Sequence, residues 1–155
     1  MVSHLAFALA LLVQDAPTYL GGDQRWAAFR TNDGRCEARG RAWRVLPDSQ
    51  QERQPMMRFI FEAGENPYVH INMRRLLPTQ ARVMLVIDDV PFVLEGTGRN
   101  AYSGDAQAID IMEALRSATK MRVTARDRTG TRFTDYYPLG GVPAAIDAAA
   151  AGCAD

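Results

Sequence analysis

Apolar and polar residues alternate along much of this chain, and a period of two is typical of β-strands with one buried face. The segment 68–73 gives the clearest example, because three apolar side chains fall on one face and three polar side chains on the other. The apolar face carries Val69, Ile71 and Met73, and the polar face carries Tyr68, His70 and Asn72. We expect the apolar face to pack on the core.

The same reasoning predicts eight strands that end at turn-forming residues. The predicted strands cover 25–30, 36–45, 57–62, 68–74, 82–87, 91–95, 121–125 and 131–137. The polar stretch Pro47–Pro55 is expected to be a loop. Gly96, Gly98 and Gly104 are expected to break the chain before the first helix.

Two helices are predicted in the last third of the chain. The first covers Ala106–Arg116 and has an apolar stripe. The residues expected to anchor it on the sheet are Ile109, Met112 and Leu115, and Ala108 and Ile111 belong to the same stripe. The second helix is alanine-rich, with Pro143 in its first turn and an end before Gly152.

Strands dominate, and the short connections between them predict mostly antiparallel pairing. We therefore predict a mostly β fold, either an antiparallel β-sandwich or a strongly curved sheet with two short covering helices. A chain of 155 residues fits one domain, and we assign residues 17–155 to a single β-rich domain.

Residues 1–16 are interpreted as a signal peptide or another N-terminal segment. The apolar run Leu5–Val13 is much shorter than the ~20 residues that cross a bilayer, so no transmembrane anchor is expected. Its length suits the apolar region of a secretory signal, although no Lys or Arg precedes it and no clear cleavage site follows. The alternative is an N-terminal strand or helix packed on the core.

The chain contains two cysteines, Cys36 and Cys153, so each has one available partner. We predict a disulfide between them, which would tie the C-terminal end to an early strand. Such a bond favours a periplasmic or secreted location, whereas two reduced thiols would indicate a cytoplasmic protein.

Basic and acidic residues balance at 18 each, so the composition does not indicate a nucleic-acid partner. Arginine is concentrated between residues 25 and 58, and Lys120 is the only lysine. This usage resembles that of a high-GC bacterial genome. We therefore interpret the arginines as a solvated strand face and give them no functional weight.

The order of several features resembles the invasion-associated locus B family of small exported alphaproteobacterial proteins. Those features are Trp26, Cys36, the hairpin 83–95, Ile109-x-x-Met-x-x-Leu, Met121-x-Val, Gly130, Tyr137-x-Leu-Gly-Gly-x-x-Ala-Ala-Ile and Cys153. The resemblance covers about residues 24–154 and rests on structural residues and their order along the chain, not on catalytic motifs. It implies a periplasmic or envelope-associated β-sandwich without known catalysis, in some cases linked to host-cell contact.

Few residues suggest catalysis. His4 and His70 are the only histidines, so neither a multi-histidine metal site nor a Ser-His-Asp triad is expected. No cofactor motif stands in the structural context that it requires. Asp88-Asp89 with Asp127 or Asp135 is more typical of turns than of a cation site. The candidate binding residues are Tyr68, His70, Asn72 and Trp43.

Three functions are compatible with this pattern. The first is a non-catalytic exported protein, periplasmic or envelope-associated, that binds a protein or envelope component. The second is a cytosolic regulatory or structural domain with reduced cysteines. The third is a small hydrolase-like enzyme that uses carboxylates and His70. The pattern favours the first, and it leaves the oligomeric state open.

Overall fold

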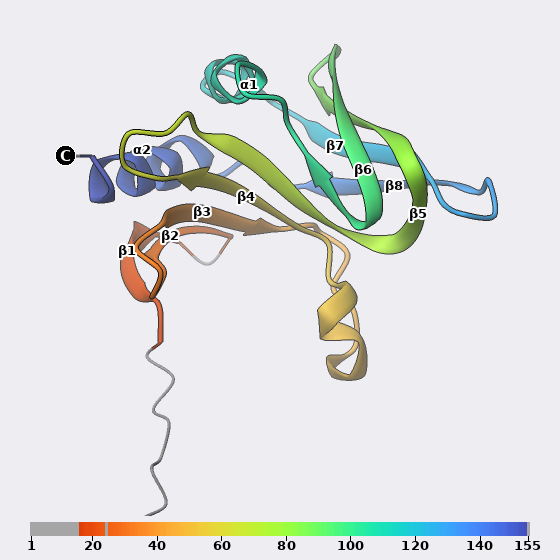
Figure 1. Ribbon diagram of the computed structural model, residues 1–155, viewed down its shortest axis with the longest axis horizontal. Coiled ribbons are helices and arrows are strands. Elements are labelled where there is room, and N and C mark those ends of the chain that lie inside the picture. Colours follow the sequence, from red (N-terminus) through yellow and green to blue (C-terminus); the bar gives the residue numbers. More distant parts are fainter. Residues whose placement is uncertain (1–15, 24, 155) are drawn as a thin grey trace, which may run out of the picture.

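Figure 1 shows the computed structural model, which describes residues 16–23 and 25–154. Its elements are β1 (Thr18–Gly22), β2 (Trp26–Arg30), β3 (Cys36–Arg41), the 3₁₀ helix η1 (Asp48–Arg53), β4 (Met56–Phe61), β5 (Tyr68–Ile87), β6 (Val90–Tyr102), α1 (Gln107–Leu115), β7 (Met121–Arg126), β8 (Arg132–Tyr137) and α2 (Val142–Gly152). The predicted mostly β fold with two short helices is confirmed.

The strands form one antiparallel sheet of eight strands in the order β1-β2-β3-β4-β5-β7-β8, and β6 pairs with β5 outside this order. Strand β5 is 20 residues long and bends strongly along its length (Figure 1). Its first part pairs with β4 and its last part with β7, and the register with β6 shifts between Asn72 and Ala81. The fold is therefore a curved sheet, the second of the two predicted forms.

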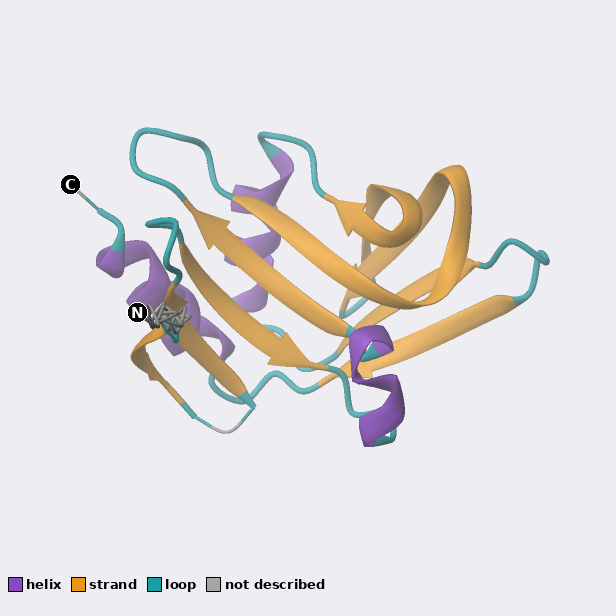
Figure 2. Cartoon of the chain, turned by 60° about the horizontal axis from the view of Figure 1, so that its bottom comes forward, coloured by secondary structure: helices purple, strands orange, loops and turns teal. Residues whose placement is uncertain are grey.

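Both helices cover the same side of the sheet. Figure 2 views the strands from the other side, with α1 and α2 behind them. Helix α2 packs on β1, β2 and β3, and α1 packs on β5. Trp26 is fully buried in this core, and its indole N–H donates to the carbonyl oxygen of Pro138 at 2.8 Å. On the outer face, η1 contacts β5, where the Asn72 side chain donates to the carbonyl oxygen of Glu52.

Several predicted boundaries were wrong because long-range pairing extends the strands. The predicted strands 68–74 and 82–87 are parts of the single strand β5, and β6 runs through Gly96 and Gly98 to Tyr102. A β-carbon on Gly96 would lie 2.6 Å from Cδ1 of Leu77, so this glycine permits close packing and does not break the chain. The segment around Gly21 and Gly22 forms strand β1, and the loop expected at 47–55 contains η1.

The predicted core face of α1 was partly wrong. Ala108, Ile111 and Leu115 are buried, whereas Ile109 is 53% exposed and Met112 is half-buried. Residues 108, 111 and 115 follow the spacing of one helical face, and Ile109 lies about 100° away from residue 108 around the axis. Ile109 therefore cannot anchor this helix on the sheet.

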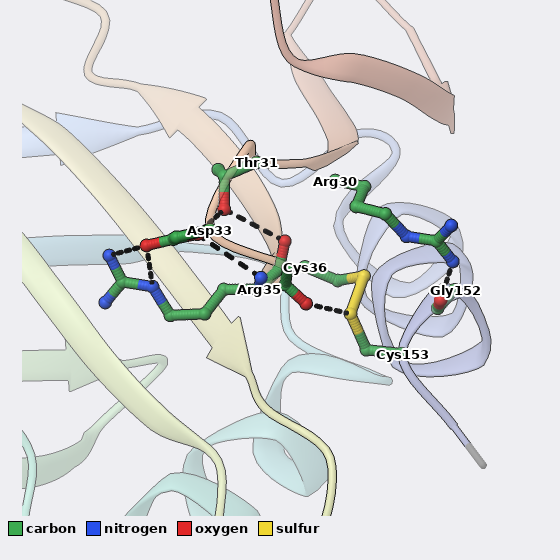
Figure 3. Close-up of a disulfide and its surroundings, with 8 residues drawn as sticks. Arg30, Thr31, Asp33, Arg35, Cys36, Gly152 and Cys153 are labelled. Carbon is green, nitrogen blue, oxygen red and sulfur yellow. Dashed lines mark hydrogen bonds and ion pairs between the residues drawn. A yellow bond between two sulfur atoms is a disulfide. The ribbon is translucent and has the colours of Figure 1, made fainter.

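The predicted disulfide is confirmed, since the Cys36 and Cys153 sulfurs lie 2.00 Å apart and their α-carbons 5.7 Å apart. The bond joins the end of α2 to the start of β3 (Figure 3). Beside it, the Arg30 guanidinium donates to the carbonyl oxygen of Gly152, a helix-end group without a partner within the helix. Two independent contacts therefore hold the C-terminal end of α2 on the sheet.

The predicted signal segment 1–16 lies, apart from Ala16, outside the described residues. Across 16–23 and 25–154, no helix has the length and apolar character that crossing a bilayer requires.

Candidate functional site

The polar face predicted for the start of β5 is present. Val69, Ile71 and Met73 are at most 1% exposed, and the three polar side chains between and beside them point to the outer face. These polar side chains line a hollow of about 420 Å³ on the surface of β3–β6. The residues that line it are Thr31, Arg35, Glu37, Arg58, Ile60, Tyr68, His70, Asn72 and Tyr102. The structure thus brings Tyr68, His70 and Asn72 together.

Antiparallel register places a row of side chains across this hollow and one residue beyond it, to Arg39. Arg39 of β3 is paired with Arg58 of β4, Arg58 with His70 of β5, and His70 with Tyr102 of β6. Directly opposed residues on one face lie within contact distance. Four strands therefore contribute neighbouring side chains to one polar row.

The His70 ring is held on three sides. Its Nε2 lies 2.9 Å from Oδ1 of Asn100, its Nδ1 lies 3.5 Å from a guanidinium nitrogen of Arg58, and the ring stacks on Tyr102 with centroids 4.8 Å apart. Arginine only donates, so Nδ1 accepts and the ring proton resides on Nε2, which donates to Asn100. Burial lowers the pKa of His70, and the ring is neutral at pH 7.

One carboxylate, that of Glu37, serves two arginines in the row. Nε of Arg39 donates to Oε1 of Glu37 at 2.6 Å, whereas Nε of Arg58 lies 3.6 Å from Oε2. The Glu37 side chain is 10% exposed, and burial lowers the pKa of Arg58 without discharging it at neutral pH. The group of three charged residues therefore carries a net charge of +1 at neutral pH.

The rim of the hollow is held by an ion pair. A guanidinium nitrogen of Arg35 lies 2.6 Å from Oδ2 of Asp33, and another donates to the Tyr68 hydroxyl at 3.3 Å (Figure 3 shows the Asp33 pair). Hydrogen bonds from the Thr31 hydroxyl and from Arg35 lower the pKa of Asp33 to about 2. Arg35 is thereby fixed toward Tyr68 at the edge of the site.

Trp43 does not belong to this hollow. Its side chain is 55% exposed, its ring lies 3.9 Å from the Arg25 guanidinium carbon, and its backbone N–H donates to the carbonyl oxygen of Tyr136 at 2.8 Å. Tyr136 is 58% exposed and Val45 is 73% exposed. We call these four residues, Arg25, Trp43, Val45 and Tyr136, the Trp43 surface.

No local sequence pattern predicts that Arg58, Asn100 or Tyr102 belongs to this hollow. Arg58 is one of the arginines interpreted above as a solvated strand face. The proximity of these three residues to His70 depends on the strand register, which is set by contacts far apart in the sequence.

The acidic residues weighed as a cation site have local partners instead. Oδ1 of Asp88 accepts hydrogen bonds from the backbone N–H groups of Thr119 and Lys120. Oδ1 of Asp127 accepts from the N–H groups of its own turn, and Asp135 accepts from Nε of Arg74 at 2.8 Å. Within the part of the chain that the structure describes, no group of three His, Cys, Asp or Glu side chains is arranged to hold a metal ion.

Comparison with known proteins gives no match to a family model, to a curated protein or to a solved structure. The functional argument therefore depends on the geometry described above. The resemblance to the invasion-associated locus B family stays a prediction from the sequence.

Proposed function

We propose that this is a non-catalytic protein that works outside the cytoplasm and binds a protein partner through the Trp43 surface. The observation that carries the proposal is the exposure of Trp43 and Tyr136 at 55% and 58%, on segments joined by a backbone hydrogen bond. Tryptophan, tyrosine and arginine dominate the energetically important positions of protein interfaces. The Arg25 guanidinium stacks on the Trp43 ring, so binding orders this side chain at a lower entropic cost.

The surroundings of His70 support the non-catalytic part of the proposal. Both ring nitrogens are already engaged, one by Asn100 and one by Arg58. A general base needs a nitrogen that faces the substrate and accepts a proton near neutral pH. Glu37, the carboxylate nearest to this row, is occupied by Arg39. These contacts argue against the alternative of an enzyme that uses His70 with carboxylates.

The pairing of Cys36 with Cys153 supports a periplasmic or secreted location, because stable disulfides are formed in oxidising compartments. The resemblance to the invasion-associated locus B family favours the same location, and we propose membership of that family on this basis. The location is tested by intact mass on protein from a periplasmic extract, with and without reductant. An N-terminally processed chain that gains two thiol hydrogens on reduction is expected, and an unprocessed chain with free thiols would contradict export.

Binding is tested with a photo-crosslinking residue placed at position 43 in the native host. We expect a discrete adduct with one partner, and we expect Tyr136→Ala to remove it. The matched control carries the same crosslinker at position 90, because Val90 is 53% exposed at the tip of the β5–β6 hairpin. Equal adducts from both positions, or none from position 43, would show that the Trp43 surface is not an interface.

A further inference from the structure

The Arg58 guanidinium lines the hollow with few close partners. Its contacts to charged or ring groups among residues 16–23 and 25–154 are Oε2 of Glu37 at 3.6 Å and Nδ1 of His70 at 3.5 Å. Both distances exceed those of strong charge-assisted hydrogen bonds, which measure about 2.7–2.9 Å. Glu37 is bound more closely by Arg39, and the Arg58 side chain remains 25% exposed. A guanidinium in this state retains donors for an added anion.

The hollow offers more than a positive charge. Its volume of about 420 Å³ falls in the range of small-molecule sites and exceeds what one carboxylate would fill. Tyr102 is 46% exposed and is held flat against His70, so it forms a rigid aromatic wall. The Tyr68 hydroxyl accepts from Arg35 and keeps its own proton for a ligand.

A second hollow of about 390 Å³ lies beyond Arg39 on the same face. It repeats the combination of arginine and aromatic side chains, with Arg25, Arg39 and Arg41 next to Tyr19 and Phe29. Asp23 also lines it, and Oδ1 of this carboxylate accepts from the backbone N–H groups of Arg25 and Trp26. Arg39 and Arg58 are cross-strand neighbours, so the two hollows adjoin. A repeated pairing of cation and ring suits a ligand built from repeated acidic rings.

We propose that this face binds an acidic glycan, with the carboxylate of a uronate unit on Arg58 and its sugar ring against Tyr102. The proposal does not depend on the Trp43 surface, which shares Arg25 with the second hollow but contributes no residue to the hollow around Arg58. A peptide is disfavoured because β3, β4 and the start of β5 are each paired on both sides, which leaves no free backbone for an added strand. The Tyr68 hydroxyl can donate to a sugar hydroxyl group. Oδ1 of Asn72 can accept from one, because the Asn72 amide nitrogen already donates to the carbonyl oxygens of Glu52 and Gln54.

The test is calorimetry or an NMR titration of the full chain with a galacturonate oligomer, with its methyl ester as a ligand of the same rings without charge. We expect the acid to bind and the ester to bind at least roughly tenfold more weakly, because the ester has lost its charge-assisted bonds. Arg58→Gln should weaken binding of the acid by a similar factor. Arg82→Gln is the control, since Arg82 is exposed on the distal half of β5.

Tyr102→Ala should keep the fold, because this side chain is half exposed. It should weaken binding of the galacturonate oligomer without changing the binding of acetate. No binding of the acid, equal binding of the ester, acetate or inorganic phosphate as tight as the oligomer, or tighter binding of an acidic peptide would each overturn the proposal. Crosslinking from position 43 should persist in Arg58→Gln. Absence of the position-43 adduct in a chain that otherwise carries the wild-type sequence and still binds the glycan would count against the proposed function alone.

Discussion

The neutral state of His70 follows from its neighbours across the strands. Arg58 on one side and Asn100 on the other fix the single proton on Nε2, and burial lowers the pKa of the ring. A second proton on Nδ1 of His70 would replace the acceptor that now faces the Arg58 guanidinium, and the two positive groups would then repel each other. Protonation of His70 therefore disrupts its contact with Arg58 in the folded protein.

We expect folding stability to fall in acid because of His70. The unfolded chain binds the proton at a pKa near 6.5, and the folded chain only at a lower pH. The free energy of unfolding should therefore decrease as the pH falls below about 6.5 toward the lower folded pKa. Urea denaturation from pH 7.5 to 5 measures this, with His70→Gln as the comparison because the carboxylates titrate in both proteins. Identical pH profiles would show that His70 is not the cause.

Gly40 is expected to tolerate no side chain. A β-carbon there would lie 2.2 Å from Cε2 of Trp26, which is fully buried and hydrogen-bonded through its indole nitrogen. Gly40→Ala should lower the free energy of unfolding by about 1 to 3 kcal/mol, the usual cost of overpacking. Gly104→Ala is the control, since nothing lies within 4 Å of its added carbon. Equal midpoints in urea for both variants would contradict this packing.

At the scale of elements, α1 separates side chains that look equivalent in the sequence. Leu115 is 3% exposed on the core face, and Ile109 is 53% exposed. Leu115→Ala should therefore cost about 2 to 5 kcal/mol, and Ile109→Ala should change the free energy of unfolding by less than about 0.5 kcal/mol. Thermal and urea denaturation of the two variants test this ranking. A larger loss from Ile109→Ala would mean that the helix presents its other face to the sheet.

Sequence patterns predicted the features that depend on neighbouring residues in the chain. Alternation assigned the two faces of 68–73 correctly, and it gathered Tyr68, His70 and Asn72 on the outer one. The same alternation could not reveal that β5 continues through 75–81, because its register with β6 shifts there. Nor could it place Arg58 beside His70, since that neighbour comes from the register of β4. In α1, isoleucines at both 109 and 111 left two overlapping stripes, and only packing against β5 distinguishes them.

At the scale of the whole molecule, the disulfide joins parts of the chain that are distant in sequence. Cys36 and Cys153 are separated by 117 residues, and the loop that they close contains β3 to α2. Arg30 holds the end of α2 without help from the sulfurs, through its bond to the Gly152 carbonyl. The main effect of the bond is therefore on the unfolded chain, which it keeps more compact.

Reduction of the disulfide is accordingly expected to destabilise the protein without unfolding α2. The loss should approach roughly 4 to 5 kcal/mol, an upper figure from loop-closure entropy. Because the reduced unfolded chain exposes more surface, the slope of the unfolding free energy against urea should rise as the midpoint falls. Urea denaturation with and without reductant measures both, and a double variant with alanine at Cys36 and Cys153 should show no response to reductant. An unchanged slope together with the loss of far-ultraviolet helix signal in native buffer would mean that the bond holds α2 in place, and that the contact from Arg30 is too weak to do so.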